Sequence, residues 1–195
     1  MYKALKKIIS ASSENYKVIL RLLEKDGSAR VCDLGCAEGR FSVQVARTIG
    51  VTEITGVDVK LEFDYEKENS GFDSKISIIG TNAELNDSLP FENERFDVII
   101  ASQVIEHIPN TDIFVKEIYR ILAPGGYAIV STPNLAAAYE ILWLILGLQP
   151  FTEEVSNEVS GLGNRFNSYY MRERRERDQS HLRSFTLPAI RDLFS

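Results

Sequence analysis

The residues with the clearest chemical potential form a short acidic turn. Residues 33–39 read Asp-Leu-Gly-Cys-Ala-Glu-Gly and follow the apolar pair Val31 and Cys32. Glycines after an apolar run let the backbone approach a nucleotide-like ligand closely. The dinucleotide pattern G-x-G-x-x-G is broken here, and the carboxylates of Asp33 and Glu38 disfavour a phosphate. The turn suits a ligand with an adenosine, a free ribose and an ammonium group.

A second carboxylate stands at a distance that fits the same ligand. Asp58 ends the apolar segment 53–58 and follows Gly35 by 23 residues. A strand-terminal acid at this spacing accepts hydrogen bonds from the ribose hydroxyls in nucleotide-binding sheets. The spacing predicts ribose binding by Asp58, with capping of a helix at Leu61 as the alternative. Asp33 is expected to attract the ammonium group, directly or through water.

The elements that must position these residues alternate between short β-branched segments and helical patterns. Strands are expected at 30–34, 53–58, 75–79, 96–101 and 127–132, and helices at 41–49, 61–69 and 113–122. This alternation predicts an α/β fold, a Rossmann-like doubly wound and mostly parallel sheet with helices on both faces. In such sheets the ligand lies beyond the carboxyl ends of the strands, where the acidic turn and Asp58 fall.

Composition excludes several classes of protein. The chain has 195 residues and a net charge of −6, which gives no reason to expect nucleic-acid binding. No segment reaches the length of a membrane span, and no secretory leader is recognisable, so a cytoplasmic protein is expected. Cys32 and Cys36 lie far in sequence from His107 and His181, so we expect neither a disulfide nor a metal site.

Several stretches share their order and spacing with the motifs of one enzyme family. VCDLGCAEGRFSVQVA is similar to an acidic residue followed by G-x-G-x-G, with Ala37 replacing the middle glycine, and ITGVDV to a strand ending in a ribose-binding acid. GTNAELNDSLPFENERFDVIIASQVIEHIPN and EIYRILAPGGYAIVSTPN are similar to the fourth strand and to the helix, turn and fifth strand that follow. The chain resembles the class I S-adenosylmethionine-dependent methyltransferases. The resemblance implies that the last two strands of that fold are absent.

The resemblance also implies a reaction and a set of site residues. The cofactor is S-adenosyl-L-methionine, the product is S-adenosyl-L-homocysteine, and the methyl group moves by in-line displacement. We expect a small-molecule acceptor. If the apolar helix at 136–148 lines the acceptor pocket, it favours an apolar acceptor. His107 is the candidate general base, with helix capping or packing beneath the cofactor as the alternative. The implied cofactor-binding residues are Asp33, Gly35, Cys36, Ala37, Gly39, Asp58, Val59, Asn82, Ala83, Ala101, Ser102 and Gln103.

The chain is interpreted as a single domain with four parts. Residues 1–28 are expected to be helical, 29–134 form the cofactor-binding core, and 186–195 hold a final helix that starts near Thr186. Residues 135–185 combine an apolar helix, expected to be buried or to face substrate, with a lid or substrate segment at 149–183. Nothing after residue 132 clearly covers the edge of the fifth strand. Either the sequence is a fragment of a longer domain or another chain covers this edge, for example by self-association.

Two other functions stay open on the sequence. An NAD-dependent oxidoreductase is disfavoured by the broken glycine spacing and by the acidic turn. A non-catalytic binding or interaction module that kept the methyltransferase fold is compatible with the absence of the last two strands. A comparison of S-adenosylhomocysteine binding with NADH binding separates the methyltransferase from the oxidoreductase. A search for methylated product separates the methyltransferase from the non-catalytic module.

Overall fold

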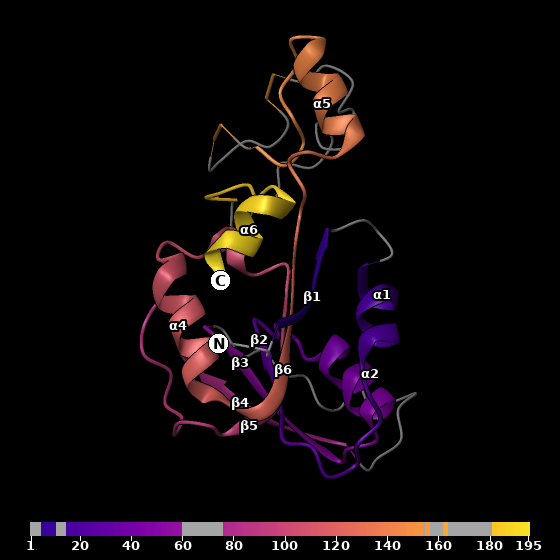
Figure 1. The fold of residues 1–195 in the computed structure, drawn as a ribbon, viewed down its shortest axis with the longest axis vertical. Helices are drawn as coiled ribbons and strands as arrows, with labels where there is room; N and C mark the ends of the chain where they lie inside the picture. The colour runs from indigo at the N-terminus through magenta and orange to yellow at the C-terminus, as the bar shows by residue number, and fades with distance from the viewer. Residues whose placement is uncertain (1–4, 11–14, 60–75, 154, 157–161, 164–180) are drawn as a thin grey trace.

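The computed structural model describes residues 5–10, 15–59, 76–153, 155–156, 162–163 and 181–195 (Figure 1). Its strands are β1 (Leu5–Ser10), β2 (Val31–Leu34), β3 (Glu53–Asp58), β4 (Ser77–Asn82), β5 (Phe96–Ser102) and β6 (Leu122–Thr132). Its helices are α1 (Asn15–Leu22), α2 (Arg40–Ile49), the 3-10 turn η2 (Ile105–His107), α4 (Thr111–Ile121), α5 (Ala138–Ile145) and α6 (Leu187–Leu193). The helix expected at 61–69 lies outside the described residues.

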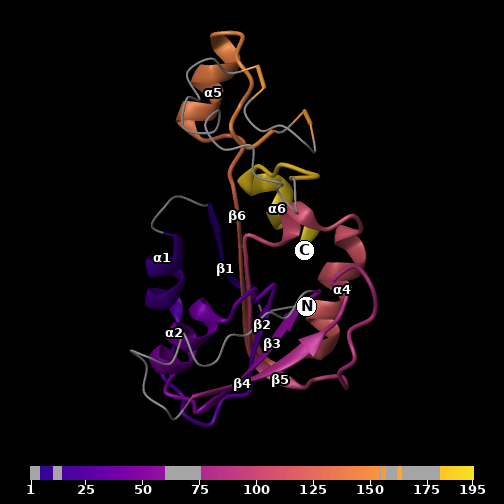
Figure 2. The ribbon, with the colours of Figure 1, turned by 180° about the vertical axis from the view of Figure 1, so that it is seen from behind.

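The described strands form one parallel sheet in the order β1-β6-β5-β2-β3-β4. Helices α1 and α2 lie on one face and α4 on the other, as the opposite views of Figures 1 and 2 both show. The chain runs outward from β2 through β3 and β4 and then continues on the other side of β2 with β5 and β6. The predicted doubly wound α/β fold is confirmed, and the strand order switches between β2 and β5.

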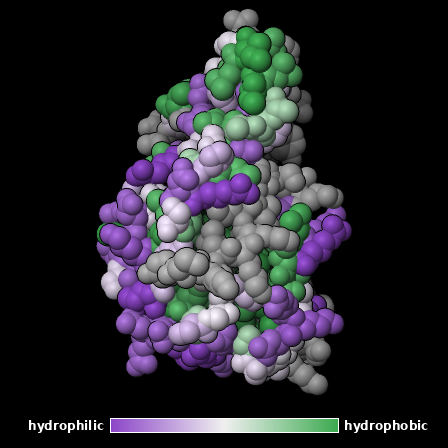
Figure 3. Space-filling model, in the orientation of Figure 1, coloured by the Kyte–Doolittle hydropathy of each residue, from purple (hydrophilic) through white to green (hydrophobic). Residues whose placement is uncertain are grey.

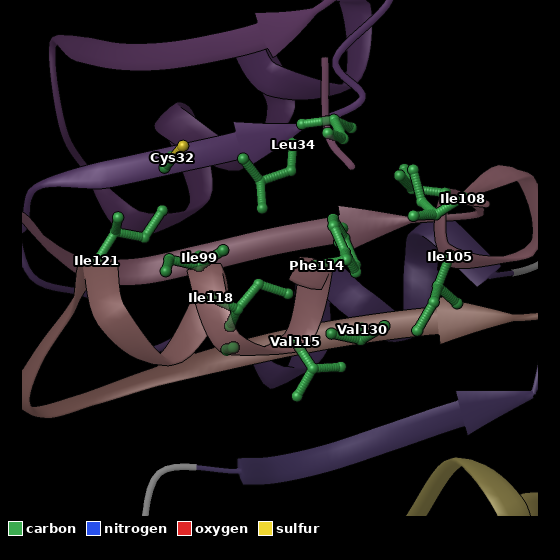
Figure 4. Packing of buried hydrophobic residues seen from close by; sticks show 14 of the residues in the cluster. Cys32, Leu34, Ile99, Ile105, Ile108, Phe114, Val115, Ile118, Ile121 and Val130 are labelled. Atoms are coloured by element: carbon green, nitrogen blue, oxygen red, sulfur yellow. The ribbon is translucent and has the colours of Figure 1, made fainter. Parts of the chain in front are cut away.

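Apolar side chains fill the space on both faces of this sheet. On one face Phe114 and Ile118 of α4 pack toward Ile99 of β5 (Figure 4). On the other face Ile19 of α1 and Val45 of α2 belong to a second cluster against the sheet. Burying a side chain of this size stabilises the fold by about 1.5–3 kcal/mol. The two layers hold the strand ends in fixed positions.

The N-terminal segment differs from the helical segment expected over residues 1–28. Residues 5–10 form β1, which pairs in parallel with β6 from Leu5 opposite Ala128 to Ser10 opposite Thr132. The expectation of an uncovered edge, and of self-association through it, is therefore wrong. The short run LKKIIS fits a helix and a strand equally well on pattern alone. The edge of β6 favours the strand, because it offers backbone groups with which an extended segment can pair.

Helix α5 also departs from its prediction. It stands away from the sheet, beyond the end of β6 (Figure 1). Of its two expected settings, burial is wrong and facing a substrate stays a prediction: Glu140 is the one buried residue of the helix, and its apolar side chains are exposed at Tyr139, Ile141, Leu142, Leu144 and Ile145. Figure 3 shows the apolar surface over α5 in green. None of the helices in the described part of the chain combines the length and the apolarity that crossing a membrane requires.

Candidate functional site

The turn after β2 folds over the carboxyl end of the sheet. Gly35, Ala37 and Gly39 all have left-handed backbone conformations, with φ of 73°, 47° and 78°. The N–H of Gly35 donates to the carbonyl of Val57 at 2.7 Å, which fixes the turn to β3. Gly35 cannot carry a side chain without rearrangement, because a Cβ would lie 2.4 Å from Cγ2 of Val104. The turn therefore presents bare backbone toward the strand ends.

Asp58, the last residue of β3, lies against this turn. Its Oδ2 accepts a hydrogen bond of 2.9 Å from the backbone N–H of Ala37. Asn82 pairs with Asp58 at the ends of β4 and β3, and the N–H of Ala83 donates to the Asp58 carbonyl at 3.2 Å. Val59 follows Asp58 directly. The residues predicted for ribose and adenine thus adjoin one another along one edge of the sheet.

Asp33 lies beneath the turn rather than on its surface, with 2% of its area exposed. Its Oδ2 accepts a hydrogen bond of 2.6 Å from the hydroxyl of Ser42 in α2. Burial raises the pKa of Asp33 to about 7; the Ser42 hydrogen bond lowers this pKa, and the charge of Asp58 raises it further. A cationic group close to Asp33 would favour its charged form, so a buried acid in this state suits a ligand with an ammonium group.

Cys36 contributes packing within the same turn. Its side chain lies against Gly56 of β3, where an added Cβ would lie 2.8 Å from the Cys36 Sγ. Cys32 and Cys36 are both buried free thiols, and burial raises the pKa of each. The backbone of Cys36, whose N–H donates to the Val57 carbonyl at 3.1 Å, is the part that shapes the turn.

A polar cluster at the carboxyl ends of β5 and β6 joins the predicted residues Ser102 and Gln103 to Asn15 and Ser131, which sequence reasoning missed. Ser102 and Gln103 follow the buried Ala101, and Gln103 has a φ of 59°, an unusual value for a residue with a side chain. The N–H of Gln103 donates to the Ser131 carbonyl at 2.9 Å. The side-chain amide of Asn15, the first residue of α1, donates to both serine hydroxyls. Non-glycine residues with φ in this range cluster at functional sites.

Two residues of η2 extend the same edge. Glu106 is 1% exposed, and neither of its carboxylate oxygens has a hydrogen-bond partner among the residues that the structure describes. Burial raises the pKa of Glu106, and the nearby Thr132 hydroxyl and His181 offset this rise only in part. The rings of His107 and His181 lie 5.0 Å apart. One ligand atom from each of Glu106, His107 and His181 lies within 4.8 Å of the others, a set of donors that divalent metals take.

The segment that carries His181 is tied to this edge by its backbone. The N–H of Leu182 donates to the Glu106 carbonyl at 2.8 Å, and Nδ1 of His181 lies 3.1 Å from the Thr152 carbonyl oxygen. The two histidines are 74 positions apart in the sequence, so no local pattern could reveal their contact. The role of His107 as a general base stays a prediction.

The fold and the site together define an α/β protein that binds a nucleoside-type cofactor at the carboxyl edge of a parallel sheet. Its sequence matches the family described as "Methyltransferase domain" over residues 9–195. The chain belongs to this family.

Individual relatives support the same assignment. The Ubiquinone biosynthesis O-methyltransferase of Chelativorans sp. (strain BNC1) is 28% identical over 132 residues, which cover 63% of this chain and 51% of that protein. The Sterol 4-C-methyltransferase strm-1 of Caenorhabditis elegans is 34% identical over 116 residues, which cover 57% and 33%. The chain therefore spans about half the length of the first of these curated relatives and about a third of the second. In fold it is similar to the YcgJ protein from Bacillus subtilis, with a TM-score of 0.62 and 18% identity over 94% of this chain and 67% of that one.

A solved N-methyltransferase that is 26% identical over 60% of this chain, with a TM-score of 0.51, contains S-adenosylhomocysteine, so the predicted cofactor S-adenosylmethionine is confirmed at the level of the family. The residues present fit it. The left-handed turn at 35–39 leaves the backbone open to close approach, and Asp58 stands at the strand end where a ribose is bound in related sheets. Among the described residues, the buried acid Asp33 interacts with the Ser42 hydroxyl and with no cation, and a ligand ammonium would supply a positive charge beside it. The individual cofactor contacts stay predictions.

Proposed function

We propose that this chain is an S-adenosylmethionine-dependent methyltransferase that passes the methyl group to a small-molecule acceptor by in-line displacement. The observation that carries the proposal is the hydrogen bond between Asp58 and Ala37, because it joins a strand-end carboxylate to a left-handed turn of the kind that a closely bound ligand requires. The bound cofactor supplies a methyl group already activated on a sulfonium. Alignment of the two reactants is then the main task of the protein, a contribution that reaches about 7–11 kcal/mol in favourable cases.

The site residues divide this task among four strand ends. In the proposal Asp58 accepts hydrogen bonds from the ribose, and residues 82–83 flank the adenine. Residues 101–103, at the end of β5, hold the methionine part, and Asp33 supplies the negative charge that its ammonium group favours. His107 takes a proton from the acceptor when the acceptor must lose one.

The acceptor that we propose is apolar. The evidence in favour is α5, which follows the carboxyl end of β6 and exposes an almost continuous apolar surface, including Ile145 at 75%. An apolar surface of this kind binds apolar molecules or other apolar surfaces. Two relatives carry names that refer to ubiquinone and to a sterol, both apolar compounds.

Thermal unfolding with S-adenosylhomocysteine tests cofactor binding. Millimolar ligand should raise the melting temperature of the wild type, since a ligand present at 100 times its Kd stabilises a protein by about 2.7 kcal/mol. Asp58→Ala should lose most of this rise and keep a folded structure, because charge-assisted hydrogen bonds to the ribose are removed. NADH serves as the control ligand and should give no rise. Equal stabilisation by NADH would favour the oxidoreductase alternative.

Product detection tests the transfer itself. The protein is incubated with isotopically labelled S-adenosylmethionine and a cell extract, and mass spectrometry identifies the labelled product. An apolar methylated compound is expected, and Asp58→Ala serves as the control that should not form it. Cofactor binding without any labelled product would favour the non-catalytic module instead.

A further inference from the structure

Asn15 is a buried polar residue with only half of its hydrogen-bonding groups in use. Its side chain is 5% exposed, and Nδ2 donates to the Oγ of Ser131 at 2.8 Å and to the Oγ of Ser102 at 3.2 Å. Its Oδ1 is buried and has no hydrogen-bond partner within the described ranges of the chain. An unpaired buried acceptor is unfavourable, so folded proteins keep one mainly where a ligand or water completes it.

Two contacts fix the position of Asn15 relative to the cofactor residues. The ring of Tyr16 packs on Phe41, with centroids 4.5 Å apart, so the start of α1 adjoins the start of α2 and the glycine turn before it. Ser102 and Ser131 are opposite each other at the ends of β5 and β6. Asn15 therefore stands between the glycine turn and the end of β5, at the switch in strand order.

We propose that Oδ1 of Asn15 accepts a hydrogen bond from the ammonium group of the cofactor's methionine part. This inference rests on the proposed function, which assigns that part of the cofactor to residues 101–103. Among the groups of the methionine part only the ammonium carries N–H donors, and a carboxylate would be repelled by Oδ1. The adenine amino group is assigned to the end of β4, which β2 and β3 separate from β5. Asn15 thus supplies a directional hydrogen bond to the ammonium group, whereas Asp33 supplies the opposite charge.

The cluster around Asn15 gives this contact a fixed geometry. The Ser131 hydroxyl that Asn15 contacts also accepts a hydrogen bond of 3.4 Å from Nε2 of Gln103, and it lies 3.3 Å from the Ser102 hydroxyl. The amide plane of Asn15 is held through its two bonds to the serines, so Oδ1 points away from them. A group fixed in this way loses little conformational freedom when the ligand binds.

Calorimetric binding of two ligands to the full chain tests the proposal. S-adenosylhomocysteine has the amino-acid part, whereas 5′-methylthioadenosine has the same nucleoside without it. Asn15→Leu should lower the affinity for S-adenosylhomocysteine about 10- to 100-fold and leave the affinity for methylthioadenosine within twofold of the wild type, because only the first ligand has the ammonium group. Asn15→Asp should keep or raise the affinity for S-adenosylhomocysteine. The new carboxylate accepts a hydrogen bond from the ammonium group, and the serine hydroxyls can turn to donate to the carboxylate. Asn93→Leu removes an exposed amide that contacts Arg120 and is the matched control, with no change in either affinity.

The outcomes separate the inference from the proposed function. Equal weakening of both ligands by Asn15→Leu, or no weakening of either, overturns the inference, and so does an Asn15→Asp variant that binds S-adenosylhomocysteine as weakly as Asn15→Leu. A wild type that binds neither ligand overturns the proposed function as well. Thermal unfolding without ligand checks that each variant is folded. Asn15→Asp decides the question by itself if Asn15→Leu does not fold.

Discussion

Asp33 is the residue whose charge state should control the stability of the ligand-free protein near neutral pH. Its pKa is raised to about 7 in the folded state, from an ordinary value of 3.8. Between these values the folded protein therefore binds the proton more tightly than the unfolded chain does. The contribution of Asp33 to the free energy of unfolding falls as the pH rises from about 4 to about 7 and is constant above that.

Replacement of Asp33 by asparagine should remove this fall. We expect the free energy of unfolding of Asp33→Asn, relative to that of the wild type, to be higher at pH 8 than at pH 5. The difference should reach a few kcal/mol, since one pKa unit corresponds to about 1.4 kcal/mol. Urea unfolding of both proteins at the two pH values measures the difference. Parallel pH profiles for the two proteins would show that Asp33 is not the titrating group.

Glu106, His107 and His181 form the second residue-scale feature with a measurable consequence. Their ligand atoms lie within 4.8 Å of one another, and zinc binds imidazole and carboxylate ligands at about 2.0–2.2 Å. The sequence predicts no metal site, but on the basis of this cluster we expect Zn²⁺ to raise the melting temperature of the untagged wild type and to leave that of His181→Ala unchanged. Glu53→Gln, an exposed acid at the start of β3, is the matched control and should respond like the wild type. If His181→Ala also responds like the wild type, the metal binds elsewhere.

The site residues differ in how far the sequence predicts them. Asp33, Gly35 and Asp58 follow from local patterns, because each lies at the end of a recognisable strand. Asn15 and His181 do not, because their partners lie far along the chain; the hydrogen bond from Asn15 to Ser131 spans 116 positions. Spacing reveals a contact only when the secondary structure between the two residues fixes their separation.

Among the elements, α4 is joined to the loop before β5 by hydrogen bonds that connect Leu89 and Phe91 to an ion pair within the helix. Nη2 of Arg120 lies 2.6 Å from Oε2 of Glu117, and the same carboxylate accepts a hydrogen bond of 2.7 Å from the N–H of Leu89. Arg120 also donates to the carbonyls of Leu89 and Phe91. The hydrogen bond from Arg120 holds the pKa of Glu117 below its ordinary value of 4.5, despite the opposing effect of burial. The pair therefore stabilises the protein above about pH 4.5, and this stabilisation is lost as the pH falls through the lower folded-state pKa.

Arg120→Ala should destabilise the protein by about 2 kcal/mol at pH 7, because it removes the cation beside the buried Glu117 carboxylate and the donor to two backbone carbonyls. The loss should be smaller at pH 3.5, because the stabilisation that the charged Glu117 contributes declines below its ordinary pKa of 4.5. Denaturant unfolding at the two pH values checks both statements. Arg95→Ala, which removes a cation that lies over the ring of Phe96, is the control for loss of positive charge. A loss for Arg120→Ala that does not depend on pH would contradict the role of the ion pair.

The elements that the sequence predicts well are those whose pattern is long or sharply bounded. The bounds of β3 and of α2 agree with the expected segments to within one residue, and Thr186 caps α6 at the predicted position. The sequence does not predict β1, because a short mixed run has no preferred period until its partner is known. It also misjudges α5, since an apolar run predicts a partner surface and does not say whether that surface belongs to the same chain.

For the whole molecule, β1 determines which strand forms this edge of the sheet. Removal of residues 1–10 should uncover β6 along the register from Ala128 to Thr132 and cause concentration-dependent association. Size-exclusion chromatography with light scattering measures this as a rise in mean mass relative to the full chain. Removal of residues 1–4 alone, which precede β1, is the control and should leave the mass per particle unchanged. A shortened chain that stays monomeric at all concentrations would mean that this edge is protected in another way.

The pairing of β1 with β6 also sets an order on synthesis and folding. Leu5 meets Ala128, so about 120 residues must leave the ribosome before the first strand has its partner. At about 5–20 residues per second, that delay is about 6–25 seconds. Contacts of such long sequence separation also form slowly once the chain is complete, because closing the loop costs entropy first. Strand β1 is thus made well before the strand that it pairs with, and the nascent chain is most open to chaperones and to mispairing until the two strands join.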